Sequence, residues 1–127
     1  MTVRVDRDPS AAGPIVEGLT ARGFAVDGGI YRALILTPRR ADEWPAPALA
    51  DLTPADLALA LDLAPPPEFL LLGTGATMAF APRALVAALD ARGIGIEAMD
   101  SRAAARAWGI LRSEGRWIAA ALMPLDG

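Results

Sequence analysis

The fold follows from residues 65–75, which read PPPEFLLLGTG. Because three consecutive prolines cannot continue a helix, the chain must enter this stretch in an extended conformation. The run from Glu68 to Leu72 then predicts a buried strand, and the glycines of Gly73-Thr74-Gly75 predict a tight turn directly after it. We expect the rest of the chain to pack around this strand.

Downstream of this strand, helical and strand patterns alternate. Pro82 suits the first turn of a helix whose inward positions are apolar, and Gly93 ends that helix. A strand, a further helix capped by Asp100 or Ser101, and a last strand follow. The expected boundaries are 82–92, 94–99, 101 to about 114, and 116–123, in that order. Strand, helix, strand, helix, strand is typical of a largely parallel sheet flanked by helices.

Upstream, residues 15–37 indicate a β-hairpin part. Their apolar or alternating runs are separated by Gly23 and by Asp27-Gly28-Gly29, which suit tight turns. The preceding hexapeptide, PSAAGP, is rich in residues that break helices and strands. We therefore expect a flexible N-terminal lead over residues 1–14 and a single α/β domain over residues 15–127.

A proline-rich connection, WPAP, begins at Trp44 and leads from the hairpin part toward the central strand. Such a connection is rigid and extended, so we expect Trp44 to be a surface aromatic and a candidate anchor for a partner protein. Thr53 next offers an N-cap hydroxyl before a proline, which predicts a helix over residues 54–63. The other tryptophans, Trp108 and Trp117, are expected to fill the core.

Length and composition bound the class of protein. The chain has 127 residues, of which 54% are hydrophobic and 21% are charged, and this globular composition suits one domain. The longest apolar runs, residues 69–72 and 117–123, are far shorter than the roughly 18 residues that span a bilayer. The first eight residues show no signal or transit peptide, so we expect a cytoplasmic protein without direct membrane insertion. The net charge of −3 and the lack of a basic cluster argue against a nucleic-acid partner.

The residue types that are missing exclude several chemistries. The sequence contains no Cys, His, Lys, Asn or Gln. It therefore offers no thiolate nucleophile, no imidazole base, no zinc site of the usual ligand sets, and no Schiff-base or P-loop lysine. A biased genome also explains this composition, because Ala and Arg are abundant where Lys and Asn are absent. We expect no catalytic residues, no metal and no cofactor, although Glu68, Glu97 and Asp100 leave carboxylate catalysis open.

The first candidate site is the loop after the central strand, because ligands bind at the carboxyl ends of strands in such sheets. Gly73-Thr74-Gly75 follows a strand, and Glu97 or Asp100 lies roughly twenty residues on, which partly matches a dinucleotide-binding fingerprint. The match fails because the third glycine position is Met78 and the loop does not open a helix directly. A plain tight turn is favoured over nucleotide binding.

The second candidate site is the start of the helix that begins at Ser101. Arg102 and Arg106 are spaced i,i+4 within its first two turns, where two cations oppose the helix macrodipole and each other. Ion pairs with Asp100 or Glu97 are one way to offset this effect. The other is an anion, or an acidic side chain of a partner, held by Thr74, Ser101 and the two arginines. A solvated helix face with ordinary ion pairs is the favoured interpretation.

Three blocks of sequence resemble a known family. They are PEFLLLGTG at residues 67–75 with FAP at 80–82, GIGIEAMDS at 93–101, and EGRWIAAAL at 114–122. The family comprises small bacterial and archaeal proteins of unassigned function and a mitochondrial assembly factor for NADH:ubiquinone oxidoreductase, respiratory complex I. The resemblance implies a three-layer α/β fold with a mixed five-stranded sheet and a β-hairpin part on one side. It also implies no established enzymatic activity and a role in binding a partner.

Two functions follow as hypotheses. The leading one is a non-catalytic protein-interaction module that assists assembly of a membrane-associated respiratory complex by binding its subunits or other assembly factors. The alternative is a small-molecule or anion-binding protein, or an enzyme of unknown type, that uses the loops at the strand ends. A concave, partly polar pocket near Thr74, Arg102 and Arg106 would favour the alternative, and an apolar surface patch would favour a partner.

Overall fold

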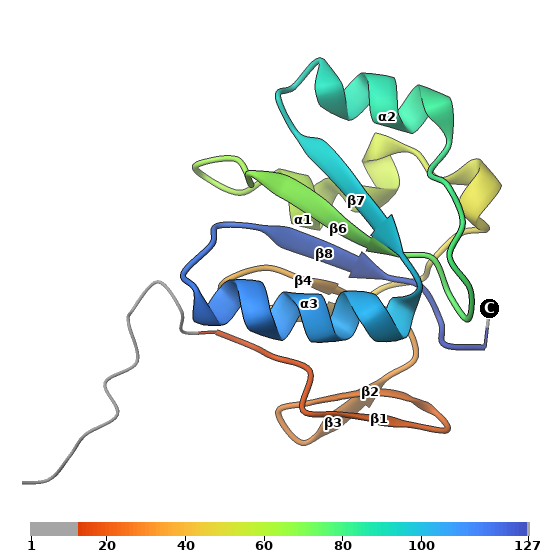
Figure 1. Cartoon of the computed structure of the whole chain (residues 1–127), viewed down its shortest axis with the longest axis vertical. Helices are drawn as coiled ribbons and strands as arrows, with labels where there is room; N and C mark the ends of the chain where they lie inside the picture. The colour runs from red at the N-terminus through yellow and green to blue at the C-terminus, as the bar shows by residue number, and fades with distance from the viewer. Residues whose placement is uncertain (1–12, 127) are drawn as a thin grey trace, which may run out of the picture.

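A five-stranded sheet forms the centre of the molecule (Figure 1). Its strands are β4 (Leu34–Leu36), β5 (Ala41–Glu43), β6 (Phe69–Gly73), β7 (Gly95–Met99) and β8 (Ala119–Leu122), in the order β5-β4-β8-β6-β7. This computed structural model describes residues 13–126. β6 pairs in parallel with β7 and β8, whereas β4 pairs antiparallel with β5 and β8. The prediction of an α/β fold with a mixed central sheet is confirmed.

Both faces of the sheet depend on β6. Leu70 and Leu72 belong to one hydrophobic cluster, whereas Leu71 between them belongs to the other. This alternation is the two-residue period of a strand, and all three side chains are at most 1% exposed. The uninterrupted apolar run therefore reflects burial on both faces, as expected for a strand between two parallel neighbours.

Helices cover one face of the sheet, and a helix with a small second sheet covers the other (Figure 1). On the first face lie η2 (Leu49–Asp51), η3 (Pro54–Leu57), α1 (Ala58–Leu61) and α2 (Arg83–Asp90). On the second lie α3 (Ser101–Ser113) and the antiparallel sheet of β1 (Gly18–Thr20), β2 (Gly23–Val26) and β3 (Gly29–Tyr31). The resulting layers are those that the family resemblance implied. Within the described range, no helix is long and apolar enough to cross a membrane.

Four segments differ from the sequence prediction. The helix expected over 54–63 is a 3-10 turn, η3, followed by the single turn α1, and it ends at Leu61. Residues 34–36 leave the hairpin part and join the central sheet as β4, where all three side chains are buried. The hairpin part itself has a third strand, β3, over Gly29–Tyr31. β5 carries no apolar signal because Ala41–Glu43 is short and polar.

The prediction that Trp44 is a surface aromatic is wrong. Its side chain is only 6% exposed and packs in the first hydrophobic cluster. The indole Nε1–H donates a hydrogen bond to the Asp56 carbonyl at 3.1 Å, which satisfies the polar end of a buried ring. The proline-rich connection thus turns Trp44 inward, so this residue is not a free anchor for a partner.

Trp108 joins the start of the described chain to α3. The ring is 0% exposed, as predicted, and its Nε1–H donates to the Pro14 carbonyl at 2.9 Å. The packed region therefore includes Pro14, which was expected to belong to the N-terminal lead. Residues 1–12 of that lead lie outside the described residues.

Glu68 links β6 to β8 at the amino ends of the two strands. Its carboxylate accepts hydrogen bonds from Arg116 Nη2 at 3.1 Å and from the Trp117 N–H at 3.0 Å. Trp117 itself is only partly buried, so the prediction that this tryptophan fills the core is wrong. Its indole Nε1–H donates a hydrogen bond to the Pro65 carbonyl at 2.7 Å. The hydrogen bond from the Arg116 guanidinium lowers the pKa of Glu68 below its ordinary value, and the hydrogen bond from the Trp117 N–H adds a smaller effect in the same direction.

Replacing Glu68 with Gln should therefore change how stability depends on pH. The folded-state pKa of Glu68 lies below that of the unfolded chain, which is ordinarily about 4.3. The ionised Glu68 carboxylate thus stabilises the folded state fully when the pH is above that ordinary value, and this stabilisation is lost as the pH falls through the folded-state pKa. In urea titrations at about pH 7 and about pH 3, we expect the wild-type chain to lose more free energy of unfolding than Glu68→Gln.

The control for this comparison is Glu97→Gln, because Glu97 is exposed and forms no ion pair with any residue in the range 13–126. The same loss of stability between the two pH values in Glu68→Gln and wild type would show that the Arg116 contact contributes nothing.

Candidate functional site

Two loops meet at the carboxyl ends of β6 and β7. The Thr74 N–H donates to the Met99 carbonyl at 2.8 Å, and the Ser101 N–H donates to the Gly75 carbonyl at 2.8 Å. These bonds continue the parallel pairing of β6 with β7 past the ends of both strands. The structure thus brings together the predicted candidates Gly73, Thr74, Gly75, Asp100 and Ser101.

The hydroxyl of Ser101 is buried where these loops meet the end of β8. Its Oγ accepts a hydrogen bond from the Gly75 N–H at 2.8 Å and donates one to the Met123 carbonyl at 2.8 Å. The side chain is 0% exposed. Gly73 lacks a side chain for a steric reason, because a Cβ there would lie 2.8 Å from Ser101 Oγ. The hydroxyl therefore joins three segments that are far apart in the sequence.

Thr74 has a similar role within its own loop. Its hydroxyl donates to the Thr77 carbonyl at 2.7 Å and accepts from the Ala79 N–H at 3.1 Å, and the residue is only 8% exposed. Both hydroxyls of the proposed anion site are thus directed inward and used by the protein. An anion would have to displace these bonds and leave buried backbone groups unpaired, which is costly.

Arg102 and Arg106 lie on the solvent side of α3. Both are exposed, and neither forms an ion pair with a residue in the range 13–126. Asp100 caps the helix instead, because its Oδ1 accepts a hydrogen bond from the Ala103 N–H at 2.9 Å. The interpretation that Asp100 or Glu97 offsets the arginines through ion pairs is wrong for the part of the chain that the structure describes.

Glu68 and Asp100 do not form a catalytic pair. Glu68 precedes β6 and Asp100 follows β7, and the register of these parallel strands pairs Phe69 with Gly95 and Gly73 with Met99. The two carboxylates therefore lie at opposite ends of the sheet and cannot act on one substrate atom. Among residues 13–126, no group of three Asp or Glu side chains is arranged to hold a metal ion.

A small hollow lies at the carboxyl end of the sheet beside Thr74. Its volume is about 240 Å³, and it is lined by Ala46, Pro47, Ala48, Leu49, Thr74, Met123 and Pro124. None of these side chains is charged, and the Thr74 hydroxyl is already bonded within its loop. The hollow is thus apolar and suited to one apolar side chain, rather than the polar pocket that anion binding requires.

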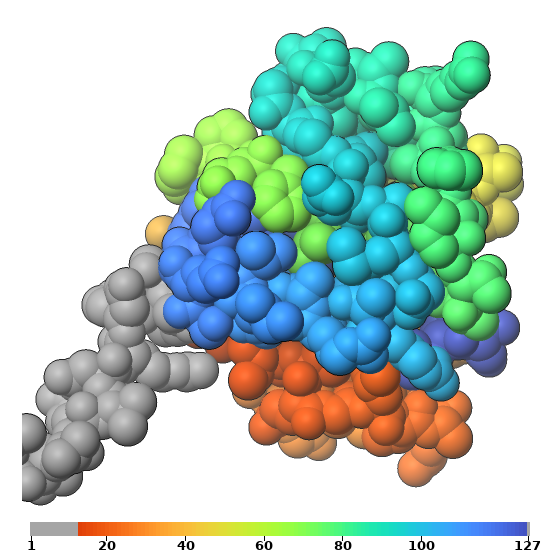
Figure 2. Space-filling model, in the orientation of Figure 1, coloured from red at the N-terminus to blue at the C-terminus, as the bar shows by residue number. Residues whose placement is uncertain are grey.

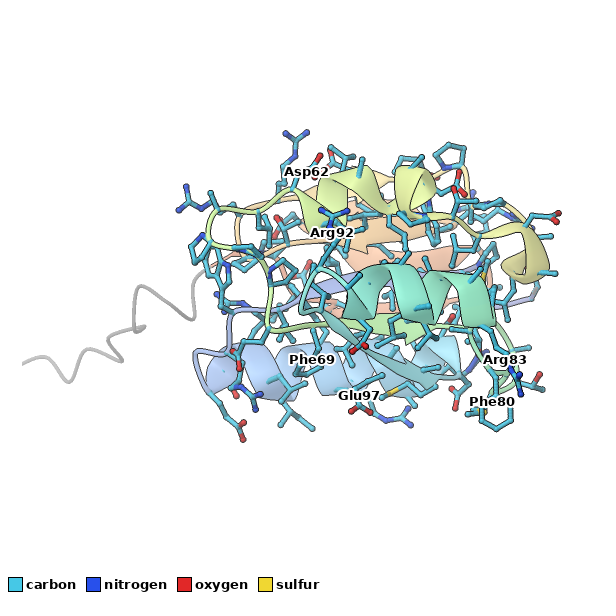
Figure 3. All side chains as sticks on the ribbon, turned by 90° about the horizontal axis from the view of Figure 1, so that it is seen from above. Asp62, Phe69, Phe80, Arg83, Arg92 and Glu97 are labelled. Carbon is cyan, nitrogen blue, oxygen red and sulfur yellow. The ribbon has the colours of Figure 1, made fainter. Side chains whose placement is uncertain are left out.

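One phenylalanine is exposed to solvent although the sequence did not predict it. Phe80 is 84% exposed, and Met78 in the same loop is 51% exposed. In Figure 3, Phe80 projects from the loop beside Arg83, the first residue of α2. The apolar run Met78-Ala79-Phe80 gives no sign of this exposure by itself. The length of the run gives no sign either, because the three-residue strand β4 is fully buried.

Comparison with known proteins identifies the family. Residues 16–123 match the family described as proteins of unknown function, DUF498/DUF598. The chain belongs to this family. The resemblance that the three sequence blocks indicated is therefore confirmed, and it covers both loops at the carboxyl end of the sheet.

Relatives of this DUF498/DUF598 chain have been found in bacteria and vertebrates. An uncharacterized protein of Rhodobacter capsulatus is 35% identical over 95% of this chain and 94% of its own length. The protein named NADH dehydrogenase (ubiquinone) 1 alpha subcomplex assembly factor 3 from Danio rerio is 30% identical over 97% of this chain and 71% of its own length. The human protein of the same name is 28% identical over 88% of this chain and 61% of its own length.

Solved structures of similar sequence have the same fold as this member of the DUF498/DUF598 family. A crystal structure from Bordetella parapertussis is 36% identical and superposes with a TM-score of 0.80, covering 89% of this chain and 97% of that one. A solution structure from Bordetella pertussis, described as an Mth938-like domain, is 27% identical with a TM-score of 0.79 and covers 99% of this chain and 94% of that one.

Ser101→Ala should be less stable than the wild-type DUF498/DUF598 chain by about 2 kcal/mol, because the buried Gly75 N–H and Met123 carbonyl lose their shared partner. Ser113→Ala is the matched control, since its hydroxyl bonds only the Ile110 carbonyl at the exposed end of α3. We expect that control to stay within about 0.5 kcal/mol of wild type in urea unfolding. Equal stabilities of the two variants would contradict the role assigned to the Ser101 hydroxyl.

Proposed function

We propose that this chain is a non-catalytic protein-interaction module that assists assembly of a membrane-associated respiratory complex. The observation that carries the proposal is the 30% identity, over 97% of the chain, to the Danio rerio assembly factor for NADH dehydrogenase. Because the aligned region extends over nearly the whole chain, the similarity is not limited to one short motif. The partner would be a subunit of that complex or another of its assembly factors.

The side-chain chemistry supports binding over catalysis. The sequence has no Cys, His or Lys, so the usual nucleophiles and bases of neutral pH are missing. The hydroxyls of Thr74 and Ser101 are engaged inside the protein, and Glu68 and Asp100 lie at opposite ends of the sheet. We place this binding role in the cytoplasm, without insertion of the chain into the membrane and without a nucleic-acid partner.

The apolar character of the strand-end surface supports a protein partner over an anion. The hollow beside Thr74 has no charged side chain in its lining, and the neighbouring loop exposes Met78 and Phe80 to solvent. Exposed apolar side chains that sit together are a common mark of protein interfaces. Polar small molecules, in contrast, are bound by converging donors or charges, and Thr74 turns its hydroxyl away from this surface.

The test is co-purification from the native host. The chain is tagged at its chromosomal locus, extracted in mild detergent, and analysed by quantitative mass spectrometry against an untagged strain. We expect subunits or assembly factors of NADH:quinone oxidoreductase to be enriched among the co-purified proteins. Their absence at native expression, also after chemical cross-linking in intact cells, would contradict the proposed function.

A further inference from the structure

The loop between β6 and α2 ends in an apolar tip formed by Met78 and Phe80. Exposure of single apolar residues is common, but a phenylalanine that is 84% exposed places almost its whole ring in water. Met78 adds a second large apolar side chain, 51% exposed, two residues away. Figure 2 shows this loop on the molecular surface beside the first turn of α3. Such a tip is suited to insertion into another surface.

The loop that carries this tip is fixed in place. The Thr74 hydroxyl bonds both the Thr77 carbonyl and the Ala79 N–H, directly before Phe80. Gly75 is held to Ser101 by two hydrogen bonds of 2.8 Å, one from each backbone N–H. Binding would therefore cost little conformational entropy in this loop. An exposed aromatic side chain on such a loop is an effective anchor.

Two arginines lie at the starts of the helices that adjoin this loop. Arg83 is the first residue of α2 and lies beside Phe80 in Figure 3, and Arg102 is the second residue of α3. Both are exposed, and within residues 13–126 neither has an ion-pair partner. α2 has no acidic residue at its N-terminus, so Arg83 opposes the helix macrodipole without local compensation, whereas the Asp100 carboxylate caps α3 beside Arg102. Carboxylates from outside the chain would remove this unfavourable arrangement.

We infer that Met78 and Phe80 insert into an apolar recess bordered by Asp or Glu side chains on a subunit of the respiratory complex. Arg83 and Arg102 form ion pairs with those carboxylates. This inference rests on the proposed function and specifies its surface. It assigns the apolar tip as the anchor and the two arginines as the residues that select an acidic partner.

Two other occupants fit the observations less well. A second copy of the chain offers the apolar hollow lined by Ala46, Leu49 and Met123, but no lining residue of that hollow is an acid that could pair with the arginines. A membrane surface would be contacted by only two apolar side chains and two arginines, which is little for stable anchoring of a chain with a net charge of −3. Charge complementarity therefore favours an acidic protein surface.

The test places a photoreactive amino acid, p-benzoylphenylalanine, at position 80 of the full chain in its native host. The control places it at Ile110, which is 61% exposed on α3. We expect light-dependent adducts with a co-purifying respiratory subunit from position 80 but not from position 110, and the cross-linked peptide should contain Asp or Glu.

Charge reversal provides the second arm of the experiment. Arg83→Glu/Arg102→Glu should lower the yield of that adduct by about tenfold or more, because attraction at each position becomes repulsion. The same double variant should unfold at an equal or higher urea concentration than wild type, since acids are favourable at helix N-termini. Arg22→Glu, an exposed change in the turn between β1 and β2, is the matched control and should leave the yield unchanged.

Each other outcome is decisive. If respiratory subunits co-purify but position 80 gives no more adduct than position 110, or if the adduct is a second copy of this chain, the inferred surface is wrong while the proposed function stands. Binding of the purified chain to phosphatidylglycerol vesicles that is lost in Phe80→Ser would assign the tip to a membrane instead. If no respiratory subunit co-purifies, the proposed function fails, and this inference fails with it.

Discussion

The buried hydroxyl of Ser101 connects the segments on which the carboxyl end of the sheet depends. It accepts a hydrogen bond from the loop after β6 and donates one to the carbonyl that follows β8, while its own backbone begins α3. Each of these groups would otherwise be a buried polar group without a partner, at a cost of roughly 1–3 kcal/mol. Gly73 is then required, because any side chain there would collide with the same hydroxyl. The position of one oxygen atom thus determines residues and backbone paths in three parts of the chain.

This arrangement separates the polar groups of the strand ends from the surface that other molecules can reach. The hydroxyls of Ser101 and Thr74 serve the loops, so the surface is formed by what projects from them: Phe80, Met78 and the exposed arginines. In many parallel sheets, the strand ends present donors and charges to a small ligand. Here the same edge of the sheet presents apolar side chains on a fixed loop, which is the chemistry of an interface between proteins.

The sequence predicted the elements that have strong local signals. The apolar run of β6, the stop at Gly93 and the cap at Asp100 are each decided by neighbouring residues, and the structure has them where expected. Trp44 was misplaced, and the exposure of Phe80 was not predicted, because both depend on distant contacts. Trp44 is drawn inward by a cluster and a carbonyl twelve residues away, whereas Phe80 is kept outside by a loop pinned to Ser101.

The candidate site, too, could be predicted from the sequence only in part. Topology alone placed Thr74 and Ser101 at one edge of the sheet, because parallel strands end together. Whether their hydroxyls face a ligand or the protein depends on which carbonyls and N–H groups lie within reach. One of these groups, the Met123 carbonyl, lies beyond the end of α3 and after β8. No local pattern around residue 101 contains that information.

Amide hydrogen exchange at Gly75, followed by NMR, tests the Ser101 bridge most directly. Because this N–H donates to a fully buried hydroxyl, it should exchange only when the whole domain unfolds, far more slowly than the Arg22 amide, which donates to the exposed Thr20 hydroxyl. Exchange of the Gly75 amide at a rate similar to that of Arg22 would show that the loop opens freely. That result would contradict the conclusion that the loop holds Phe80 in a fixed position.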